Sequence, residues 1–86
     1  MKIEEKLKEL EGWSLIDGQL VREFIFDSFL DGINFIEKVS EIAEEQNHHP
    51  DIDIRYNKII CRVMSHDIGA ITDRDFLLAG KINHIV

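Results

Sequence analysis

Cysteine, proline and basic residues are all scarce in this sequence, and two of these shortages exclude classes of protein. The one cysteine, Cys61, has no partner for an intramolecular disulfide, so the fold does not depend on an oxidising compartment. No apolar run approaches the length that spans a bilayer, and residues 1–12 lack the apolar stretch of a secretion signal. We therefore expect a cytoplasmic protein that does not enter a membrane.

The shortage of positive charge argues against binding to nucleic acid. Ten Lys and Arg residues stand against 17 Asp and Glu residues, which gives a net charge of −7, and the basic residues are scattered. Direct binding to DNA or RNA needs clustered Lys and Arg to neutralise phosphates. We expect no direct nucleic-acid partner and interpret the acidity as a contribution to solubility.

Length and apolar content predict one globular domain over residues 1–86. Hydrophobic residues make up 44% of the chain, which is too many for a disordered protein. A domain of this size buries only about 60–65% of the surface of its extended chain, so its stability is marginal. Self-association is a common remedy for such a small core.

Local patterns predict a short helix and a hairpin at the start of the chain. Apolar residues recur at helical spacing before Gly12, so we expect a helix over residues 2–11. Asp17-Gly18 favours a two-residue turn, because both turn positions need positive φ. The turn would join a strand at Trp13–Ile16 to a strand at Gln19–Phe26.

A long amphipathic helix is predicted next. Ser28 and Asp31 have the spacing of a capping box, in which the serine takes a free amide and the carboxylate reaches back. Pro50 disfavours helix at the residue before it, so the helix should end near Asn47. The apolar stripe of this helix consists of Phe29, Ile33, Phe35, Ile36, Val39, Ile42 and Ala43.

The second half of the chain repeats the hairpin–helix order. Residues 51–56 alternate as a half-buried strand, Asn57-Lys58 can turn the chain, and residues 59–64 return. After a loop, Thr72 and Asp75 form a second capping box that opens a last helix. Its apolar face is predicted to carry Phe76, Ala79, Ile82 and Val86.

These elements predict an α+β fold: a short N-terminal helix followed by β-β-α-β-β-α. The economical arrangement is a four-stranded antiparallel sheet with the helices packed on one face. The uncovered face would remain rather apolar, which hints at a partner, most simply a second copy of the chain. The residues expected on that face are Val21, Ile25, Ile60 and Met64.

Three histidines lie in or beside two loops, and they are the strongest candidates for chemistry. His48-His49-Pro50 leaves the long helix and His66 leaves the last strand, so the two loops can face one another across a cleft. Imidazoles give and take protons near neutral pH. Solvated loop histidines without a role are the plainer alternative. A metal site is a third reading, but adjacent residues on an extended segment point to opposite sides, so His48 and His49 would not readily bind one ion.

A longer pattern resembles the signature of the pterin-4a-carbinolamine dehydratases. The matching segments are EEQNHHPDIDIRYNK and SHDIGAITDRD, and similar residues occur at Gly12-Trp13, Arg22-Glu23-Phe24 and Phe35. The resemblance covers nearly the whole chain. Its motif positions are Glu44, His48, His49, Pro50, Tyr56, His66 and Asp75.

The resemblance implies a metal-independent, cofactor-free dehydration of a 4a-hydroxy-tetrahydropterin to quinonoid dihydropterin, which recycles tetrahydropterin for an aromatic amino acid hydroxylase. Two imidazoles in opposite protonation states would suit the reaction, each contributing roughly 10²–10⁴ in rate. The family also forms homodimers and homotetramers, and some relatives act instead as non-enzymatic dimerisation or assembly partners of other proteins. That role is the alternative function.

Residue roles follow from the same resemblance. His48, His49 and His66 match the family's active-site histidines, with His48 and His66 expected as acid and base and His49 expected to hold the pterin. A segment beside His66 matches a stretch that contacts substrate. The full expected substrate-binding set is His48, His49, Pro50, Ser65, His66, Asp67 and Ile68.

Other positions keep two readings each. Glu44 either hydrogen-bonds an imidazole or is solvated, and Asp75 either caps the last helix or orients a histidine. Tyr56 is expected to pack in the core rather than touch ligand. Ile52 stands where animal relatives tend to carry an aromatic residue, which bears on substrate preference only. The remaining residues of interest are expected to be core or surface: Trp13, Cys61 and His84.

Overall fold

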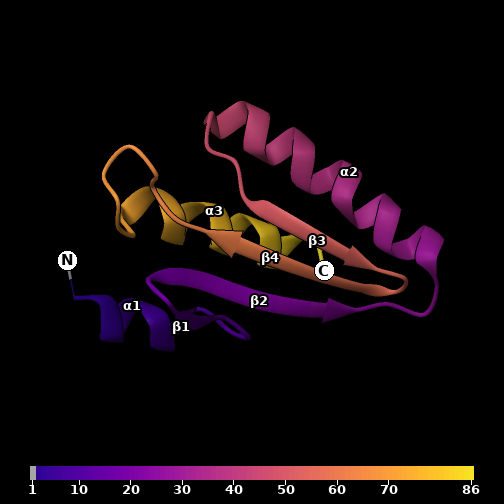
Figure 1. Ribbon diagram of the computed structural model, residues 1–86, viewed down its shortest axis with the longest axis horizontal. Coiled ribbons are helices and arrows are strands. Elements are labelled where there is room, and N and C mark those ends of the chain that lie inside the picture. Colours follow the sequence, from indigo (N-terminus) through magenta and orange to yellow (C-terminus); the bar gives the residue numbers. More distant parts are fainter. Residues whose placement is uncertain (1) are drawn as a thin grey trace.

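Four antiparallel strands form one sheet in the computed structural model, which describes residues 2–86 (Figure 1). The strand order is β1-β2-β4-β3, so the two hairpins meet along β2 and β4 at the centre of the sheet. This is the α+β fold predicted from the sequence. The elements are α1 (Ile3–Lys8), β1 (Ser14–Ile16), β2 (Gln19–Ile25), α2 (Phe29–Gln46), β3 (Asp51–Arg55), β4 (Lys58–Val63) and α3 (Asp73–His84).

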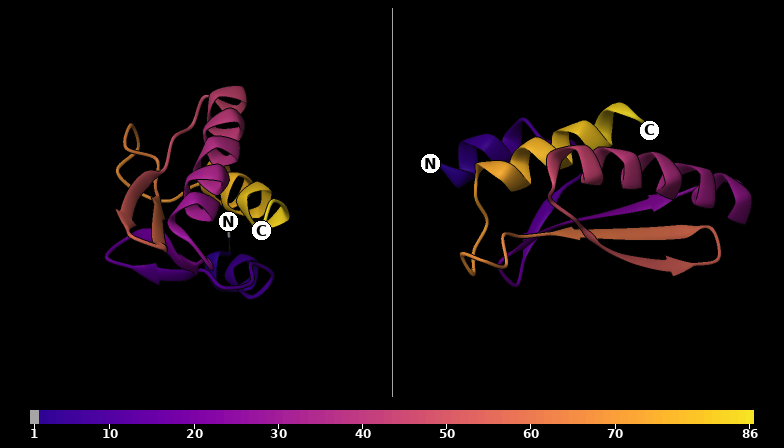
Figure 2. Two further views of the ribbon diagram at one scale, coloured as in Figure 1. Left: turned by 90° about the vertical axis from the view of Figure 1, so that its right-hand side faces the viewer. Right: turned by 90° about the horizontal axis from the view of Figure 1, so that it is seen from above.

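The helices lie together on one face of the sheet, as the view from above in Figure 2 shows. The core between the layers is built from alternate residues of β2 and β4 and from the apolar stripes of α2 and α3. Gly32 lets α2 approach β4 closely, because a Cβ there would lie 3.3 Å from Cδ1 of Ile59. No helix in the described range is long and apolar enough to cross a membrane.

Turn and cap chemistry explains where the elements begin. Asp17 and Gly18 both have positive φ, at 50° and 77°, as the predicted β1–β2 turn requires. Ser28 accepts a hydrogen bond from the amide of Asp31 at 3.0 Å and thereby caps α2. Of the predicted Ser28 capping box, the described structure records this half alone. At α3 the box is complete, since Asp75 accepts from the amide of Thr72 at 2.7 Å.

Several predicted boundaries are shifted. The N-terminal helix covers Ile3–Lys8 rather than 2–11, and the other strands and helices differ by one or two residues at their ends, where fraying makes assignment soft. Val86 lies beyond α3 and is 62% exposed, so its placement on the helix face was wrong. The register pairs Arg55 with Lys58, which puts Tyr56 and Asn57 in the turn.

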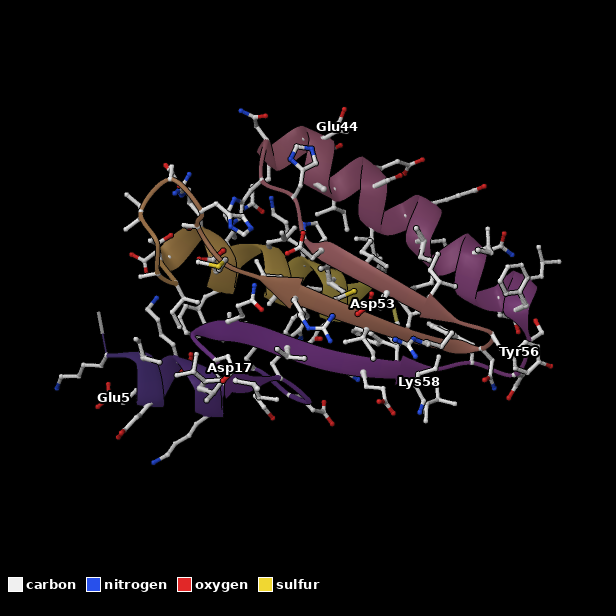
Figure 3. All side chains as sticks on the ribbon, in the orientation of Figure 1. Glu5, Asp17, Glu44, Asp53, Tyr56 and Lys58 are labelled. Atoms are coloured by element: carbon white, nitrogen blue, oxygen red, sulfur yellow. The ribbon has the colours of Figure 1, made fainter. Side chains whose placement is uncertain are left out.

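The predicted burial of Tyr56 is the clearest error of the sequence analysis. It was expected in the core, yet its φ is 55° and its side chain is 70% exposed at the tip of the β3–β4 hairpin. Figure 3 places it at the end of the molecule where α2 begins. Alternation along a strand stops predicting burial once the chain enters the turn, because a turn residue no longer belongs to either face of the sheet.

The uncovered sheet face carries both apolar side chains and ion pairs. Val21, Ile25 and Ile60 belong to it, but they are interleaved with ion pairs between Arg62 and Asp53 and between Lys58 and Glu23. Met64, which was expected on this face, instead packs against the core. Three of the four apolar residues predicted for this face therefore lie on it, and the prediction was wrong for Met64.

Candidate active site

The end of α2 gives two adjacent histidines different degrees of burial. Asn47 adopts the left-handed conformation, with φ 52° and ψ 44°, and the amide of His48 donates to the carbonyl of Ala43 at 3.0 Å. This hydrogen-bonded reversal is a common way to end a helix. The chain then runs on toward β3, so that His48 is buried and His49 remains exposed.

His48 points to the first turn of α3. Its Nε2 lies 2.5 Å from Oδ1 of Asp75, and the imidazole and carboxylate side chains are 8% and 0% exposed. The partners come from the end of one helix and the start of another. A fully buried carboxylate needs several donors to be stable, because burial removes its water.

Asp75 receives those donors on its second oxygen. Oδ2 accepts from Oγ of Ser65 at 2.9 Å and from the amide of Thr72 at 2.7 Å. Asp75 therefore completes the capping box of α3 and also holds the imidazole of His48. The two readings of Asp75 that the sequence left open are both realised in the geometry.

The other two histidines also lie beside carboxylates. Nε2 of His49 lies 2.5 Å from Oε2 of Glu44, with both side chains exposed. Figure 3 shows Glu44 near the end of α2, far from the Tyr56 hairpin tip. Nε2 of His66 lies 3.8 Å from Oδ2 of Asp51, and this pair is also exposed. Each of the three imidazoles thus has its own acidic neighbour.

A surface cavity of about 260 Å³ brings the three histidines together. Its walls come from two loops and the start of α3. This is the cleft between the loops after α2 and β4 that the sequence predicted. Its lining residues are Asn47, His48, His49, Met64, His66, Asp67 and Arg74.

Arg74 connects the walls of this cavity. Its Nη2 lies 2.6 Å from Oδ1 of Asp67, and the hydrogen bond from the guanidinium holds the pKa of that carboxyl below its ordinary value of 3.8. Its carbonyl accepts from Nε2 of Gln46 at 2.8 Å, which ties α3 to the end of α2. The cavity therefore contains a permanent positive charge next to an ionised carboxylate.

The cavity does not contain every residue expected to bind substrate. Ser65 is fully buried behind it, where it contacts Asp75, and Pro50 and Ile68 are not among the lining residues. The motif did not single out four residues that lie at or beside the site: Asn47, Asp51, Met64 and Arg74. Their position next to motif residues is the signal that could have identified them, because Asp51 follows Pro50 and Arg74 precedes Asp75.

The remaining residues of interest lie in the core or at the surface, away from the cavity. Cys61 and Trp13 are buried in the core as expected, and His84 is exposed at the end of α3. Within residues 2–86, no group of three or more His, Cys, Asp or Glu side chains is arranged to hold a metal ion.

Comparison with known proteins gives a consistent result. A family described as Pterin 4 alpha carbinolamine dehydratase matches residues 1–85. Two relatives assigned by name to the pterin-4-alpha-carbinolamine dehydratases cover 99% of this chain. One, from Sulfurisphaera tokodaii, is 44% identical over 91% of its own length, and the other, from Mycobacterium avium, is 45% identical over 90% of its length.

Solved structures share this fold. A protein from Brucella melitensis, titled a transcriptional coactivator/pterin dehydratase, superposes with a TM-score of 0.93 at 29% identity and covers 98% of this chain and 92% of its own. A pterin dehydratase-like RuBisCO assembly factor of the alpha-carboxysome shares the fold, with a TM-score of 0.69 at 16% identity over 85% of this chain and 84% of its own. The full-length match and the level of identity show that the chain belongs to the pterin-4-alpha-carbinolamine dehydratase family.

Proposed function

We propose that this protein dehydrates a 4a-hydroxy-tetrahydropterin to quinonoid dihydropterin by histidine acid–base catalysis. Family membership and the names of the relatives support a dehydratase acting on a pterin. The observation that carries the catalytic proposal is the convergence of His48, His49 and His66 on one cavity, each beside a carboxylate.

The reaction needs two proton transfers and no change in oxidation state. A protonated imidazole gives its proton to the 4a-hydroxyl, which leaves as water. A neutral imidazole removes the proton from the neighbouring ring nitrogen of the pterin. The electron pair of the broken N–H bond then forms the new C=N bond between that nitrogen and the 4a carbon. Each transfer is worth roughly 10²–10⁴ in rate, which corresponds to about 3–5 kcal/mol of barrier.

The environments of the three imidazoles support different roles. His48 is buried and fixed by Asp75, whereas His66 is exposed and its carboxylate neighbour is 3.8 Å away. We assign the acid and base roles to His48 and His66 because their surroundings differ most. His49 then holds the pterin from the rim, with Glu44 orienting its ring.

The remaining contacts belong to the same proposal. Asp67 and Arg74 offer an acceptor and a donor at the cavity wall, which suits the polar edge of a pterin. Pro50 and Ile68 each follow a residue that lines the cavity, and we propose that they touch the bound ring or its side chain. Ile52 packs against the core, so a different residue there affects substrate preference only indirectly.

The direct test is a stopped-flow measurement of the decay of a chemically prepared 4a-hydroxy-tetrahydropterin, followed by ultraviolet absorbance with and without the protein. Strong acceleration that is lost in His66→Ala supports the proposal. No acceleration by protein whose fold is verified by circular dichroism contradicts it. Comparing substrates with different C6 side chains, including tetrahydrobiopterin, then defines the pterin that is preferred.

A second candidate function is non-enzymatic binding to another protein. The coactivator and assembly-factor titles of the structural neighbours motivate it, and so do large apolar side chains exposed at one end of the molecule. In Figure 1 this is the end where β2 finishes, α2 begins and the β3–β4 hairpin turns. These side chains are Ile25, Phe29, Leu30 and Tyr56, each at least 50% exposed.

Two measurements separate the candidates. Recovery of one stoichiometric partner from a lysate of the source, together with no binding of pterin, favours the second function. Analytical ultracentrifugation tests the proposal of a homodimer or homotetramer, because a clean species at the 10.0 kDa chain mass would contradict it. An association that Leu30→Asp abolishes would assign the exposed apolar end to contacts between copies of this chain.

A further inference from the structure

Ser65 occupies a position that neither its sequence context nor the dehydration chemistry explains. It lies directly before His66 and was expected to touch substrate, yet it is 0% exposed and does not line the cavity. Its hydroxyl instead contacts Oδ2 of Asp75 at 2.9 Å and Oγ1 of Thr72 at 2.8 Å. The buried Ser65 hydroxyl, the partly buried Thr72 hydroxyl and the buried Asp75 carboxylate therefore form a cluster behind His48.

Counting protons fixes the direction of the hydrogen bond between the two hydroxyls. The Ser65 hydroxyl has one proton and donates it to Asp75, so it must accept the proton of the Thr72 hydroxyl. Oγ1 of Thr72 in turn accepts from the amide of Arg74 at 3.3 Å. Oδ2 of Asp75 therefore faces two donors, the Ser65 hydroxyl and the Thr72 amide.

The N-terminus of α3 lies beside the same carboxylate. Asp75 is the third residue of the helix, where the helix dipole favours negative charge. A carboxylate fixed in this way accepts from Nε2 of His48 and holds the hydrogen on that nitrogen. Nδ1, for which the described residues provide no recorded partner, remains the nitrogen that can exchange a proton with substrate.

We propose that Ser65 is a positioning residue: together with Thr72 it holds the Asp75 carboxylate in the orientation that keeps His48 in its Nε2–H tautomer and presents Nδ1 to the substrate. The catalytic consequence rests on the proposed dehydratase function, whereas the tautomer is a property of the free protein. Ser65 thus acts through Asp75 and His48, from behind the cavity, and makes no contact with the pterin.

The first arm of the test is independent of activity. Long-range ¹H–¹⁵N NMR of ¹⁵N-histidine-labelled protein reports which ring nitrogen carries hydrogen. We expect the wild type to show His48 as the Nε2–H tautomer, Ser65→Ala to show a mixture of tautomers, and Ser65→Thr, which keeps the hydroxyl, to resemble the wild type. Ser40→Ala is the matched control, because the Ser40 hydroxyl bonds a carbonyl on the exposed side of α2. An Nδ1–H tautomer in the wild type would overturn the proposal.

The second arm separates positioning from substrate contact. In Ser65→Ala we expect kcat to fall about 10-fold, since a hydrogen bond to a charged group is worth roughly that factor, with KM changed less than about 2-fold. A raised KM with unchanged kcat would mean that Ser65 binds substrate, and unchanged values of both would mean that the cluster has no catalytic role. Either result overturns the proposal. If wild-type protein has no dehydratase activity, the proposed function fails while the NMR arm still decides the tautomer.

If Ser65→Ala does not fold, Thr72→Val serves in its place. It removes the hydroxyl proton that Ser65 accepts but keeps the Thr72 amide on Asp75. The proposal then expects an intermediate tautomer population and a smaller loss of kcat than Asp75→Asn gives. A wild-type tautomer together with a wild-type kcat in Thr72→Val would contradict it.

Discussion

Nε2 of His48 lies 2.5 Å from Oδ1 of Asp75, although 27 positions separate the two residues in sequence. The contact joins the end of α2 to the first turn of α3, and it is buried. One carboxylate therefore serves as a helix cap and as the partner of a candidate catalytic histidine. Folding of α3 and preparation of the site are coupled through this single side chain.

Replacing either His48, which is buried, or His66, which is exposed, should remove most of the dehydration rate. We expect His48→Ala and His66→Ala each to slow dehydration by about 100-fold or more, the usual scale of one acid or base contribution. Stopped-flow kinetics measure the effect, and His84→Ala, at the exposed end of α3, is the matched control. Near-wild-type turnover in both site variants would defeat the catalytic assignment.

Removing the charge of Asp75 should destabilise the fold as well as the site. In Asp75→Asn one carboxylate oxygen becomes an NH2 donor, so His48 keeps its hydrogen bond only in the tautomer that accepts at Nε2. Where His48 stays Nε2–H, a buried hydrogen bond is lost at a cost of about 1–3 kcal/mol. Urea unfolding measures the loss. Asp27→Asn is the control, because Asp27 is exposed and has no recorded ion pair or side-chain hydrogen bond in the described structure, so the change should alter stability by less than about 0.5 kcal/mol.

Arg74 should control the titration of Asp67. Arg74→Gln removes the guanidinium, so the pKa of Asp67 should rise toward 3.8. A lowered folded-state pKa contributes stability above the unfolded value, and that contribution disappears as pH falls through the lowered pKa. The variant should therefore lose less stability than the wild type on acidification below about pH 4. Carboxyl ¹³C NMR measures the titration of Asp67. Arg55→Gln is the control, because Arg55 lies at the end of β3 away from the cavity, and it should leave the pKa of Asp67 unchanged.

Cys61 should be inert in the folded protein. Burial raises the pKa of its thiol to about 12, so almost no thiolate is present near neutral pH, and the side chain is 0% exposed. We expect alkylation by iodoacetamide at pH 8 to proceed at the rate at which the chain unfolds. An exposed thiol introduced by Ser40→Cys should react directly, and equally fast reaction of Cys61 would contradict its buried placement.

Asn83 should be the residue that fastens the N-terminal segment to α3. Its Oδ1 accepts from Nε1 of Trp13 at 2.7 Å and from Nη1 of Arg22 at 2.6 Å, and its Nδ2 donates to the carbonyl of Glu11 at 3.0 Å. Asn83→Ala leaves these partners without Asn83 and should cost about 1–3 kcal/mol. Thermal and urea unfolding check this, with the exposed Asn34→Ala as control. A loss below 0.5 kcal/mol would mean that water replaces the amide.

The sequence by itself determined the elements of the fold, because each depends on near neighbours. Asp17-Gly18 specifies a tight turn through its backbone preferences, and Ser28 supplies a side-chain acceptor for the amide of Asp31 in the first turn of α2. Apolar periodicity then selects the face that each element buries. The same patterns failed at Tyr56, where the strand gives way to a turn and alternation loses its meaning.

The motif also identified the three histidines, and their spacing placed them in two loops that meet. Only the tertiary structure decided which partner each side chain has. Asp51, Arg74 and Ser65 acquire their positions from the docking of α3 and the loop after β4 against the end of α2, and no local rule encodes those distances. The physical reason is that hydrogen-bond partners at long sequence separation are chosen by packing of the core, whereas turns, caps and periodicity are chosen by the chain within a few residues.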